Sequence, residues 1–282
     1  MTLSIEQDVI EQHRVDALNA AFWDTLCGAN LARSMGITDH SRESLSKFDD
    51  CYFTFYPYLF DHIPFHDLRG RRVLEVGLGY GTVAQRIIES GADYTGLDIA
   101  PGPVAMVNHR LQLNGYTGRA LRGSILHAPF PDAGFDYVIS IGCYHCTGDA
   151  ERAFEESYRI LRPQGVLVAM VYNAYSYRRW LNAFRQTTRY LLWDLFRLGQ
   201  VSVASAAERA AYDMDLTGNA PPCTEFLSRR RLRQVCRQFS SFHAVLRNID
   251  QEPPFGERCR SELMGTIWPS VCGLDVYIEA RK

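Results

Sequence analysis

Short apolar segments alternate with amphipathic segments between residues 70 and 172. The apolar segments end in glycine or acidic residues, as buried strands and their turns do, and residues 149–161 have the spacing of an amphipathic helix. This alternation predicts an α/β fold, doubly wound, with a mostly parallel seven-stranded sheet. We expect strands at residues 73–76, 92–99, 121–125, 135–142 and 166–172, and closing strands at residues 242–249 and 271–280.

The segments on either side of this alternation differ in composition. Residues 1–69 are helical in pattern and rich in aromatic side chains, which predicts an N-terminal cap. Residues 173–225 are a basic and aromatic insertion, and residues 226–282 contain a helix and the closing strands. Ligands of open α/β sheets bind beyond the carboxyl ends of the strands. We therefore expect residues 70–172 to hold a ligand that the cap and the insertion cover.

Within the insertion, residues 176–198 combine arginines with a stripe of Leu, Phe and Trp. Such a basic amphipathic helix either covers an apolar cleft with its arginines in water, or contacts a membrane surface or an anionic partner. We expect the covering role and leave peripheral membrane contact open. No apolar run is long enough to predict a membrane-spanning helix.

An acid and three alternating glycines follow the first apolar strand. Glu75 precedes Gly77, Gly79 and Gly81, and a helix is expected from about residue 80 to residue 90. Glycine reaches φ > 0 at little cost and has no Cβ to hold a ligand away from the backbone. A dinucleotide-binding turn has the spacing Gly-x-Gly-x-x-Gly and holds a pyrophosphate, which a carboxylate would repel. The loop therefore favours a positively charged ligand.

The second apolar strand ends in another acid, Asp98, 17 residues after Gly81. An acid at this place accepts hydrogen bonds from ribose hydroxyls, unless it serves only to cap the next helix. Together, Glu75, the glycine loop and Asp98 resemble the class I S-adenosylmethionine-dependent methyltransferase family, of the bacterial small-molecule type. The resemblance covers residues 70–173 closely and residues 271–282 more loosely.

The resemblance implies S-adenosylmethionine as the cofactor and S-adenosylhomocysteine as its product. The family usually places an acid or a small polar residue near the adenine amino group, and that position is Ser124 here. Tyr56, in the aromatic run 52–60, is the candidate to cover the sulfonium, although such rings also pack on a sheet. Besides Glu75, the three glycines and Asp98, the implied cofactor-binding positions are Leu78, Ile99, Ser124, Ile125, Gly142 and Tyr56.

Catalysis of methyl transfer rests mainly on positioning. Bringing the acceptor in line with the methyl group contributes about 7–11 kcal/mol, and a general base adds about 10²–10⁴-fold. His145 follows the fourth strand, where family members often present a histidine or aromatic residue, so it is the candidate base. A second hypothesis is that His145 packs beside the cofactor or forms a hydrogen bond with the backbone. Tyr144 is expected to lie against the methionine part of the donor.

The composition of the chain limits which partners and which cellular location we expect. The chain has 282 residues, 46% of them hydrophobic, and its net charge of −2 gives no general attraction to nucleic acid or anionic membranes. Residues 1–8 lack the pattern of an export signal, so we expect a cytoplasmic protein whose eight cysteines are reduced. Cys143 and Cys146 resemble half of a zinc site, but no second ligand pair follows, so no metal is expected.

The sequence thus predicts a methyltransferase that uses S-adenosylmethionine to methylate an oxygen, nitrogen or sulfur atom of a small metabolite. A nucleic-acid methyltransferase is disfavoured, because such enzymes typically carry an Asn/Asp-Pro-Pro-aromatic motif where residues 142–145 stand. A non-catalytic S-adenosylmethionine-binding regulatory module and a dinucleotide-dependent oxidoreductase are less favoured hypotheses. The sequence determines neither the acceptor nor the oligomeric state.

Overall fold

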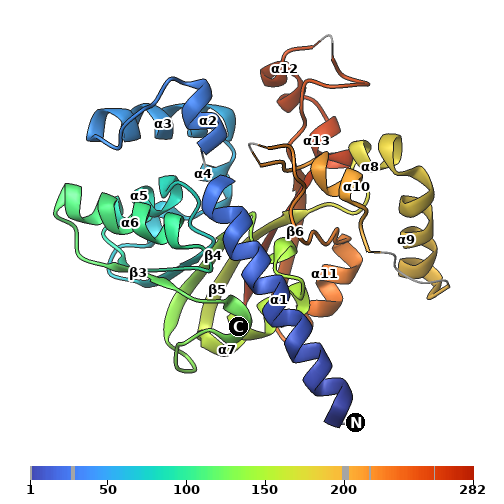
Figure 1. Cartoon of the computed structure of the whole chain (residues 1–282), viewed down its shortest axis with the longest axis horizontal. Coiled ribbons are helices and arrows are strands. Elements are labelled where there is room, and N and C mark those ends of the chain that lie inside the picture. Colours follow the sequence, from blue (N-terminus) through green and yellow to red (C-terminus); the bar gives the residue numbers. More distant parts are fainter. Residues whose placement is uncertain (1, 27–28, 199–202, 216, 257) are drawn as a thin grey trace.

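A seven-stranded sheet forms the centre of the structure (Figure 1). The computed structural model describes residues 2–26, 29–198, 203–215, 217–256 and 258–282. The strand order is β3-β2-β1-β4-β5-β7-β6, and among the described strands only β7 runs antiparallel to its neighbours, so the doubly wound α/β fold is confirmed. The strands are β1 (Arg72–Val76), β2 (Asp93–Asp98), β3 (Arg119–Arg122), β4 (Phe135–Ile141), β5 (Leu161–Tyr172), β6 (Ser241–Arg247) and β7 (Asp275–Arg281).

Helices surround this sheet and continue into its flanking segments. The helix expected from about residue 80 begins at Thr82, because Gly81 takes the left-handed conformation that ends the glycine loop. The α-helices are α1 (Thr2–Leu26), α2 (Ala29–Ser34), α3 (Arg42–Phe55), α4 (Leu59–His62), α5 (Thr82–Glu89), α6 (Pro101–Asn114), α7 (Ala150–Ile160), α8 (Tyr177–Asn182), α9 (Phe184–Phe196), α10 (Ala206–Ala210), α11 (Arg229–Val235), α12 (Arg260–Met264) and α13 (Trp268–Cys272). The short 3-10 helices are η1 (Phe65–Asp67), η2 (Ile125–His127) and η3 (Tyr144–Cys146).

Successive side chains of the central strands enter two apolar cores, one on each face of the sheet. Leu74 and Leu167 pack into the core that includes side chains of α7 and α11. Val73 and Val168 pack into the core that includes side chains of α5 and α6. Because neighbouring residues of a strand point to opposite faces, a strand covered on both faces is apolar throughout. This explains the continuous apolar segments of the sequence.

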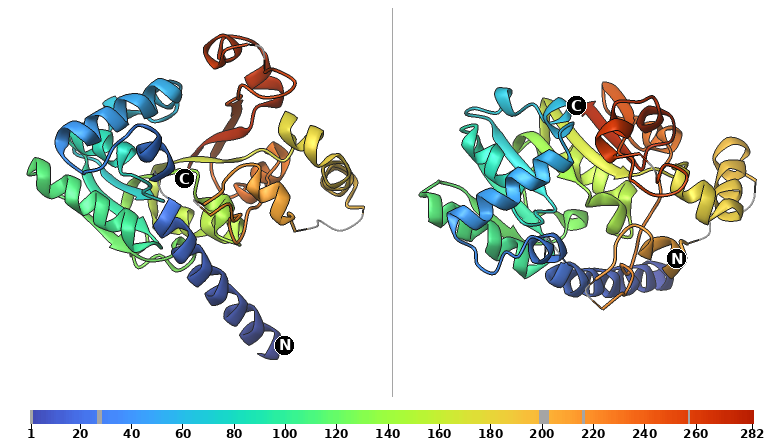
Figure 2. Two further views of the ribbon diagram at one scale, coloured as in Figure 1. Left: turned by 45° about the horizontal axis from the view of Figure 1, so that its top comes forward. Right: turned by 90° about the horizontal axis from the view of Figure 1, so that it is seen from above.

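The N-terminal cap approaches the carboxyl ends of the strands through α1 and α3. Asn19 on α1 donates a hydrogen bond to the carbonyl of Cys146 (2.7 Å), and Asp24 accepts one from the amide of Gly102 (2.5 Å). Figure 1 shows α1 running obliquely across the molecule, and in the right-hand view of Figure 2 it lies along one side of the body. The cap is therefore attached to loops at the ends of β4 and β2.

Residues 173–225 leave the sheet after β5 and return beside it, where the amide of Leu227 donates to the carbonyl of Tyr172 (2.9 Å). Within this insertion, the prediction of a single helix over residues 176–198 is wrong. The structure has two helices, α8 and α9, separated at Ala183, whose backbone is not helical (φ −139°). The small, buried side chain of Ala183 fits at this turn. Residues 199–202 and 216 lie outside the described residues.

Three expected strand boundaries are also wrong. The fifth strand begins at Leu161 rather than at Val166, because Leu161 already pairs with Phe135 of β4 before an irregularity in the register. The third strand ends at Arg122, because the hydroxyl of Ser124 accepts a hydrogen bond from the amide of Leu126 and begins η2. The last strand begins at Asp275, because Pro269 lies in the first turn of α13, where proline favours a helix. The segment between β6 and β7 projects beyond the body of the molecule (Figure 2). No described helix combines the length and the apolar character that a membrane span requires.

Candidate functional site

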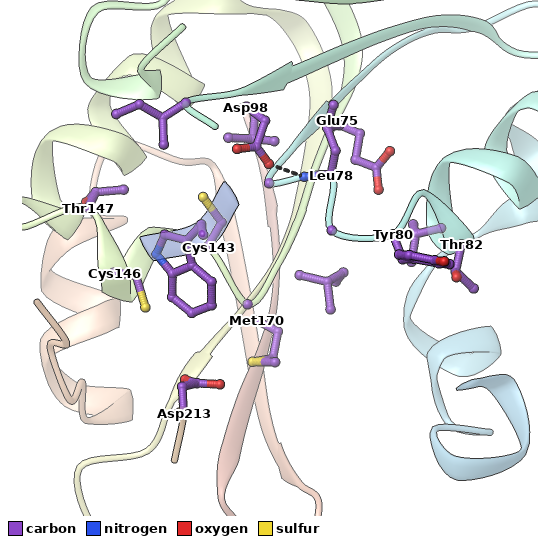
Figure 3. A pocket seen from close by; sticks show the side chains of 18 of the residues that line it. Glu75, Leu78, Tyr80, Thr82, Asp98, Cys143, Cys146, Thr147, Met170 and Asp213 are labelled. Carbon is purple, nitrogen blue, oxygen red and sulfur yellow. Dashed lines mark hydrogen bonds between the residues drawn. The ribbon is translucent and has the colours of Figure 1, made fainter. Parts of the chain in front are cut away.

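A cavity of about 580 Å³ opens at the carboxyl ends of β1, β2, β4 and β5. Its size suits a small organic ligand. Residues of α1, α3 and the 212–214 segment of the insertion line it together with the strand ends. The covering role expected of residues 176–198 is wrong for this cavity, because none of them lines it. Figure 3 shows side chains of the strand ends, of the glycine loop and of the insertion around one space.

The glycine loop forms one wall of the cavity. Gly77 and Gly79 have positive φ values of 81° and 52°, which glycine adopts at little cost. A Cβ at Gly77 would stand 2.5 Å from the Cβ of Cys143, whereas a Cβ at Gly79 would meet no atom within 4 Å. Gly79 therefore faces open space of the cavity, where its lack of a side chain leaves room for a ligand.

Asp98 holds the loop from the neighbouring strand. Its Oδ2 accepts a hydrogen bond from the amide of Leu78 (2.7 Å), as Figure 3 shows, and its Oδ1 accepts one from the amide of Ala100 (2.9 Å). Burial raises the pKa of Asp98, while these backbone hydrogen bonds oppose the rise. A carboxylate has about four acceptor positions, so Asp98 retains capacity for a ligand that enters the cavity.

Glu75 lies on the opposite side of the loop from Asp98, at the end of β1. Its Oε2 accepts a hydrogen bond from the hydroxyl of Tyr94 (2.6 Å), and its side chain is 3% exposed. Burial raises the pKa of Glu75 to about 8, and the hydrogen bond from Tyr94 opposes this rise. A buried acid of this kind becomes ionised when a positive charge enters its surroundings. The electrostatics of the loop therefore favour a cationic ligand.

The remaining expected cofactor positions also line the cavity. Ile99 follows Asp98 on the rim, and Ser124 and Ile125 lie beyond the end of β3. Gly142 has φ +84°, and a Cβ there would stand 3.6 Å from the Cε of Met170. Tyr56 lines the cavity from the end of α3, with its ring 5.0 Å from that of Tyr52. The structure thus brings together the positions that the sequence proposed for the donor.

The placement expected for His145 and Tyr144 is wrong. Both side chains are fully buried, and neither lines the cavity. The hydroxyl of Tyr144 bonds to Ser157 (2.6 Å) in the core. Both ring nitrogens of His145 lack a hydrogen-bond partner among the described residues, its ring lies 4.0 Å from that of Tyr172, and burial lowers its pKa to about 3. The chain after β4 turns into η3, which directs both side chains inward.

Other residues of the cavity were not predicted from the sequence. Asp213 in the insertion accepts a hydrogen bond from the hydroxyl of Tyr172 (2.8 Å), and Asp275 is opposite Tyr172 across β5 and β7. Met170 and Tyr277 form the next pair on the same face. An acid directly before the apolar residues 276–278 of β7 is a signal for such a site. The sequence indicated only a covering role for residues 212–213.

Comparison with known proteins identifies the domain. Residues 74–169 match a family described as Methyltransferase domain. A crystal structure of an S-adenosylmethionine-dependent methyltransferase from Mesorhizobium loti superposes with a TM-score of 0.56 at 18% identity, covering 80% of this chain and 97% of that one. A methyltransferase structure from Methanosarcina mazei gives a TM-score of 0.52 at 15% identity, covering 80% and 97%. These similarities concern the fold.

Curated relatives match the same region. A phthiotriol/phenolphthiotriol dimycocerosates methyltransferase of Mycobacterium leprae is 38% identical over 103 residues, which are 36% of this chain and 37% of that protein. A demethylmenaquinone methyltransferase of Thermus thermophilus is 34% identical over 102 residues, 36% of this chain and 46% of that protein. The matched stretch thus spans less than half of either relative. Residues 74–169 of this chain therefore match the methyltransferase domain family, on a fold shared with solved S-adenosylmethionine-dependent methyltransferases.

Proposed function

We propose that this chain transfers a methyl group from S-adenosylmethionine to an oxygen, nitrogen or sulfur atom of a small molecule. The observation that carries the proposal is the cavity wall made by Glu75, the glycine loop and Asp98. The buried acid Glu75 suits the positive charge of the donor, and Asp98 has acceptor capacity for ribose hydroxyls. The open space at Gly79 accommodates a ligand against the backbone. The residues present therefore fit this donor.

When bound, the donor supplies a methyl group on a positively charged sulfur, which is already activated for displacement. The chain's own residues then have to exclude water and fix the acceptor in line with the methyl group. Asn19 and Trp23 of α1 and Phe48 of α3 line the cavity. Phe48 is 2% exposed and its ring lies 4.3 Å from that of Tyr80 in the loop. The cap thus contributes apolar surface that keeps water from the site.

The relatives support a small-molecule acceptor. Their names specify phthiotriol or phenolphthiotriol dimycocerosates in one case and demethylmenaquinone in the other, and both are organic molecules rather than nucleic acids. The cavity favours the same class of acceptor, because among its described lining residues there is no arginine or lysine to hold a phosphate backbone. We therefore prefer a small molecule to a nucleic acid.

Isothermal titration calorimetry of the full chain with S-adenosylmethionine and S-adenosylhomocysteine tests the donor assignment. We expect Asp98→Asn to weaken binding at least about tenfold, since it removes a charge-assisted interaction with the ribose. Asp93→Asn is a matched control, because Asp93 is exposed at the other end of the same strand and should leave the affinity unchanged. Circular dichroism shows whether each variant is folded.

Two results would contradict this proposal. The first is absence of heat with either ligand together with binding of a nicotinamide or flavin nucleotide, which would support an oxidoreductase. The second is tight donor binding without formation of S-adenosylhomocysteine in metabolite extracts, which would support a regulatory module. Methyl-labelled donor followed by mass spectrometry of labelled products identifies the acceptor class.

The helices α8 and α9 support an additional proposal about the surface of the protein. Phe184 and Phe196 are 62% and 64% exposed, and Arg185 and Arg189 are exposed on the same helix. Exposed apolar rings beside arginines suit peripheral contact with an anionic membrane. We expect the full chain to co-sediment with vesicles that contain phosphatidylserine, and a variant with Phe184→Ser and Phe196→Ser to remain in the supernatant. Equal sedimentation of both would contradict this contact.

A further inference from the structure

The cavity has a second end, away from the glycine loop, that the donor positions do not include. It lies where β5 and β7 pair, with Tyr172 opposite Asp275 and Met170 opposite Tyr277. All four residues line the cavity, as does Asp213. Figure 3 shows Asp213 on the far side of the cavity from Asp98, with Met170 between them. We call Tyr172, Tyr212, Asp213, Asp275 and Tyr277 the acceptor end.

Asp275 is the most unusual residue of the acceptor end. It is 2% exposed, and its Oδ2 accepts a hydrogen bond from Asn248 (2.9 Å). Its Oδ1 has no hydrogen-bond partner among the described residues. A buried carboxylate without a partner is costly, so proteins normally pair it with a positive charge or a hydrogen-bond donor. Asp275 therefore has an unsatisfied oxygen at the wall of a cavity.

Among the described residues, no cationic side chain lines the cavity at this end. The described lining residues contain the acids Asp16, Glu75, Asp98, Asp213 and Asp275, and none of them is Arg, Lys or His. The nearest arginines are already paired outside the cavity, since Arg178 contacts Asp250 and Glu252 and Arg260 contacts Asp250. These two arginines and two acids balance each other. Arg178 opposes the rise in the pKa of Asp213 and Asp275 from a distance, but no described arginine, lysine or histidine forms an ion pair with either carboxyl group.

The donor does not compensate both ends of the cavity. S-adenosylmethionine has a sulfonium, an ammonium and a carboxylate group, and therefore a net charge of one positive unit. Once the donor has ionised Glu75, the carboxylates of Glu75 and Asp98 at the donor end carry two negative charges, which is more than the donor neutralises. The negative charge of Asp213 and Asp275 is therefore available to a second ligand of the cavity.

Aromatic rings surround the same two acids. The rings of Tyr172 and Tyr212 lie 4.6 Å apart, and Tyr172 donates a hydrogen bond from its hydroxyl to Asp213 (2.8 Å). Tyr277 lines the cavity beside Asp275, and Tyr52 and Tyr56 face it from the cap. Faces of tyrosine rings attract cations, above all where water is excluded. Acid and ring together form a surface for an organic cation, whereas a neutral acceptor needs no acid here.

We propose that the acceptor of this chain is a small organic amine, bound as its cation at Asp275 and Asp213 among the tyrosine rings, and methylated on nitrogen. This inference rests on the proposed methyltransferase function. The ammonium group first gives one proton to a carboxylate of the acceptor end. The nitrogen lone pair then forms the bond to the methyl carbon, the carbon–sulfur bond breaks, and its electron pair stays on sulfur. The product is a methylated ammonium and a neutral thioether.

The acidity of Asp275 agrees with this role. Burial raises its pKa to about 7, and the hydrogen bond from Asn248 and the positive charge of Arg178 oppose the rise. Burial also raises the pKa of Asp213, which the hydrogen bond from Tyr172 opposes. A group with a pKa near neutrality exchanges a proton efficiently in that pH range.

The test compares an amine with its neutral counterpart. The full chain is saturated with S-adenosylhomocysteine and titrated calorimetrically with 2-phenylethylamine and with 2-phenylethanol, which share the ring and the chain. We expect the amine to bind at least about tenfold more tightly, since one charge-assisted contact is worth this much. Equal affinity, a preference for the alcohol, or no binding of either would overturn the inference.

Two variants locate the effect. Asp275→Asn and Asp213→Asn should each reduce the preference for the amine several-fold and leave the affinity for S-adenosylhomocysteine unchanged, because both residues lie away from the glycine loop. Asp213 is in a loop, so its variant tests the idea even if Asp275→Asn does not fold. The matched control Asp93→Asn should retain the full preference. A preference that persists in both acceptor-end variants would overturn the assignment.

Turnover gives an independent readout. Pools of primary and secondary amines, of phenols and of thiols are incubated separately with methyl-labelled donor, and we expect label in the amine pool. Label only in the phenol or thiol pool would overturn the amine inference and leave the methyltransferase function intact. Failure of the wild-type chain to bind S-adenosylhomocysteine would instead contradict the proposed function itself.

Discussion

Asp49 on α3 accepts two hydrogen bonds from Arg110 on α6, at 2.8 and 2.9 Å. Arg110 is 1% exposed and also donates to the carbonyl of Tyr80 (2.9 Å), while the hydroxyl of Thr82 donates to Asp49 (2.6 Å). This pair thus joins the N-terminal cap to the glycine loop. It also explains why residue 81 is a glycine, because a Cβ there would stand 2.8 Å from the Cδ of Arg110.

Removing Asp49 should therefore affect both stability and donor binding. We expect Asp49→Ala to lower the free energy of unfolding by about 3–5 kcal/mol, because it leaves the guanidinium of Arg110 buried without its partner. Donor affinity should fall as well, since α3 would no longer be fixed against the loop. Urea denaturation and calorimetry measure the two effects. Asp50→Ala, an exposed neighbour on the same helix, should change stability by less than about 0.5 kcal/mol.

Donor affinity should rise with pH through the titration of Glu75. Its pKa is raised to about 8 in the free protein, so at neutral pH Glu75 is mostly protonated, whereas a positively charged donor favours the carboxylate. Binding then releases a proton, and affinity should increase by up to about tenfold per pH unit below pH 8 and level off above it.

Calorimetry between about pH 6 and pH 9 measures this dependence. Glu75→Gln should bind the donor more weakly and lose this contribution to the slope, whereas the donor's own ammonium titrates equally with both proteins. Asp275→Asn should keep the rise, because Asp275 lies at the acceptor end. An identical slope in wild type and Glu75→Gln would show that another group is responsible.

Gly77 and Gly79 should respond differently to alanine. Gly77→Ala places a Cβ 2.5 Å from Cys143 at φ +81°, so we expect a loss of stability of about 1–3 kcal/mol or more. Gly79→Ala meets no protein atom, so its cost should be limited to the left-handed backbone, about 1 kcal/mol. Donor affinity should nevertheless fall strongly in Gly79→Ala. Thermal unfolding and calorimetry separate the two outcomes, and unimpaired binding by Gly79→Ala would exclude close contact there.

His145 should prove dispensable for methyl transfer. His145→Leu removes two ring nitrogens that have no partner among the described residues, so stability should fall by no more than about 1 kcal/mol and can rise. Donor affinity and turnover should stay within about twofold of wild type, because the side chain does not line the cavity. A large loss of turnover with normal donor affinity would restore the role of base to His145.

The donor end could be predicted from the sequence because its parts are close along the chain. Glu75, Gly79 and Asp98 lie at two consecutive strand ends, and parallel strands bring their carboxyl ends to one edge by geometry alone. The positive φ of the glycines is likewise a local property of the loop. Local pattern and sheet topology were enough to place these residues together.

Only the tertiary structure showed which residues come together at the acceptor end and where the side chain of His145 points. Asp213 reaches Tyr172 from an insertion with no regular repeat, and Asp275 reaches it through antiparallel pairing of β7 with β5, two contacts that no local pattern encodes. Asp98 is the last residue of β2, whereas His145 lies beyond the end of β4 in η3, and this turn directs its side chain into the core. The sequence determined which edge of the sheet binds a ligand, because the alternation of strands and helices makes the strands parallel and brings their carboxyl ends to one edge. Side-chain orientation in irregular segments depends on long-range packing and had to be observed.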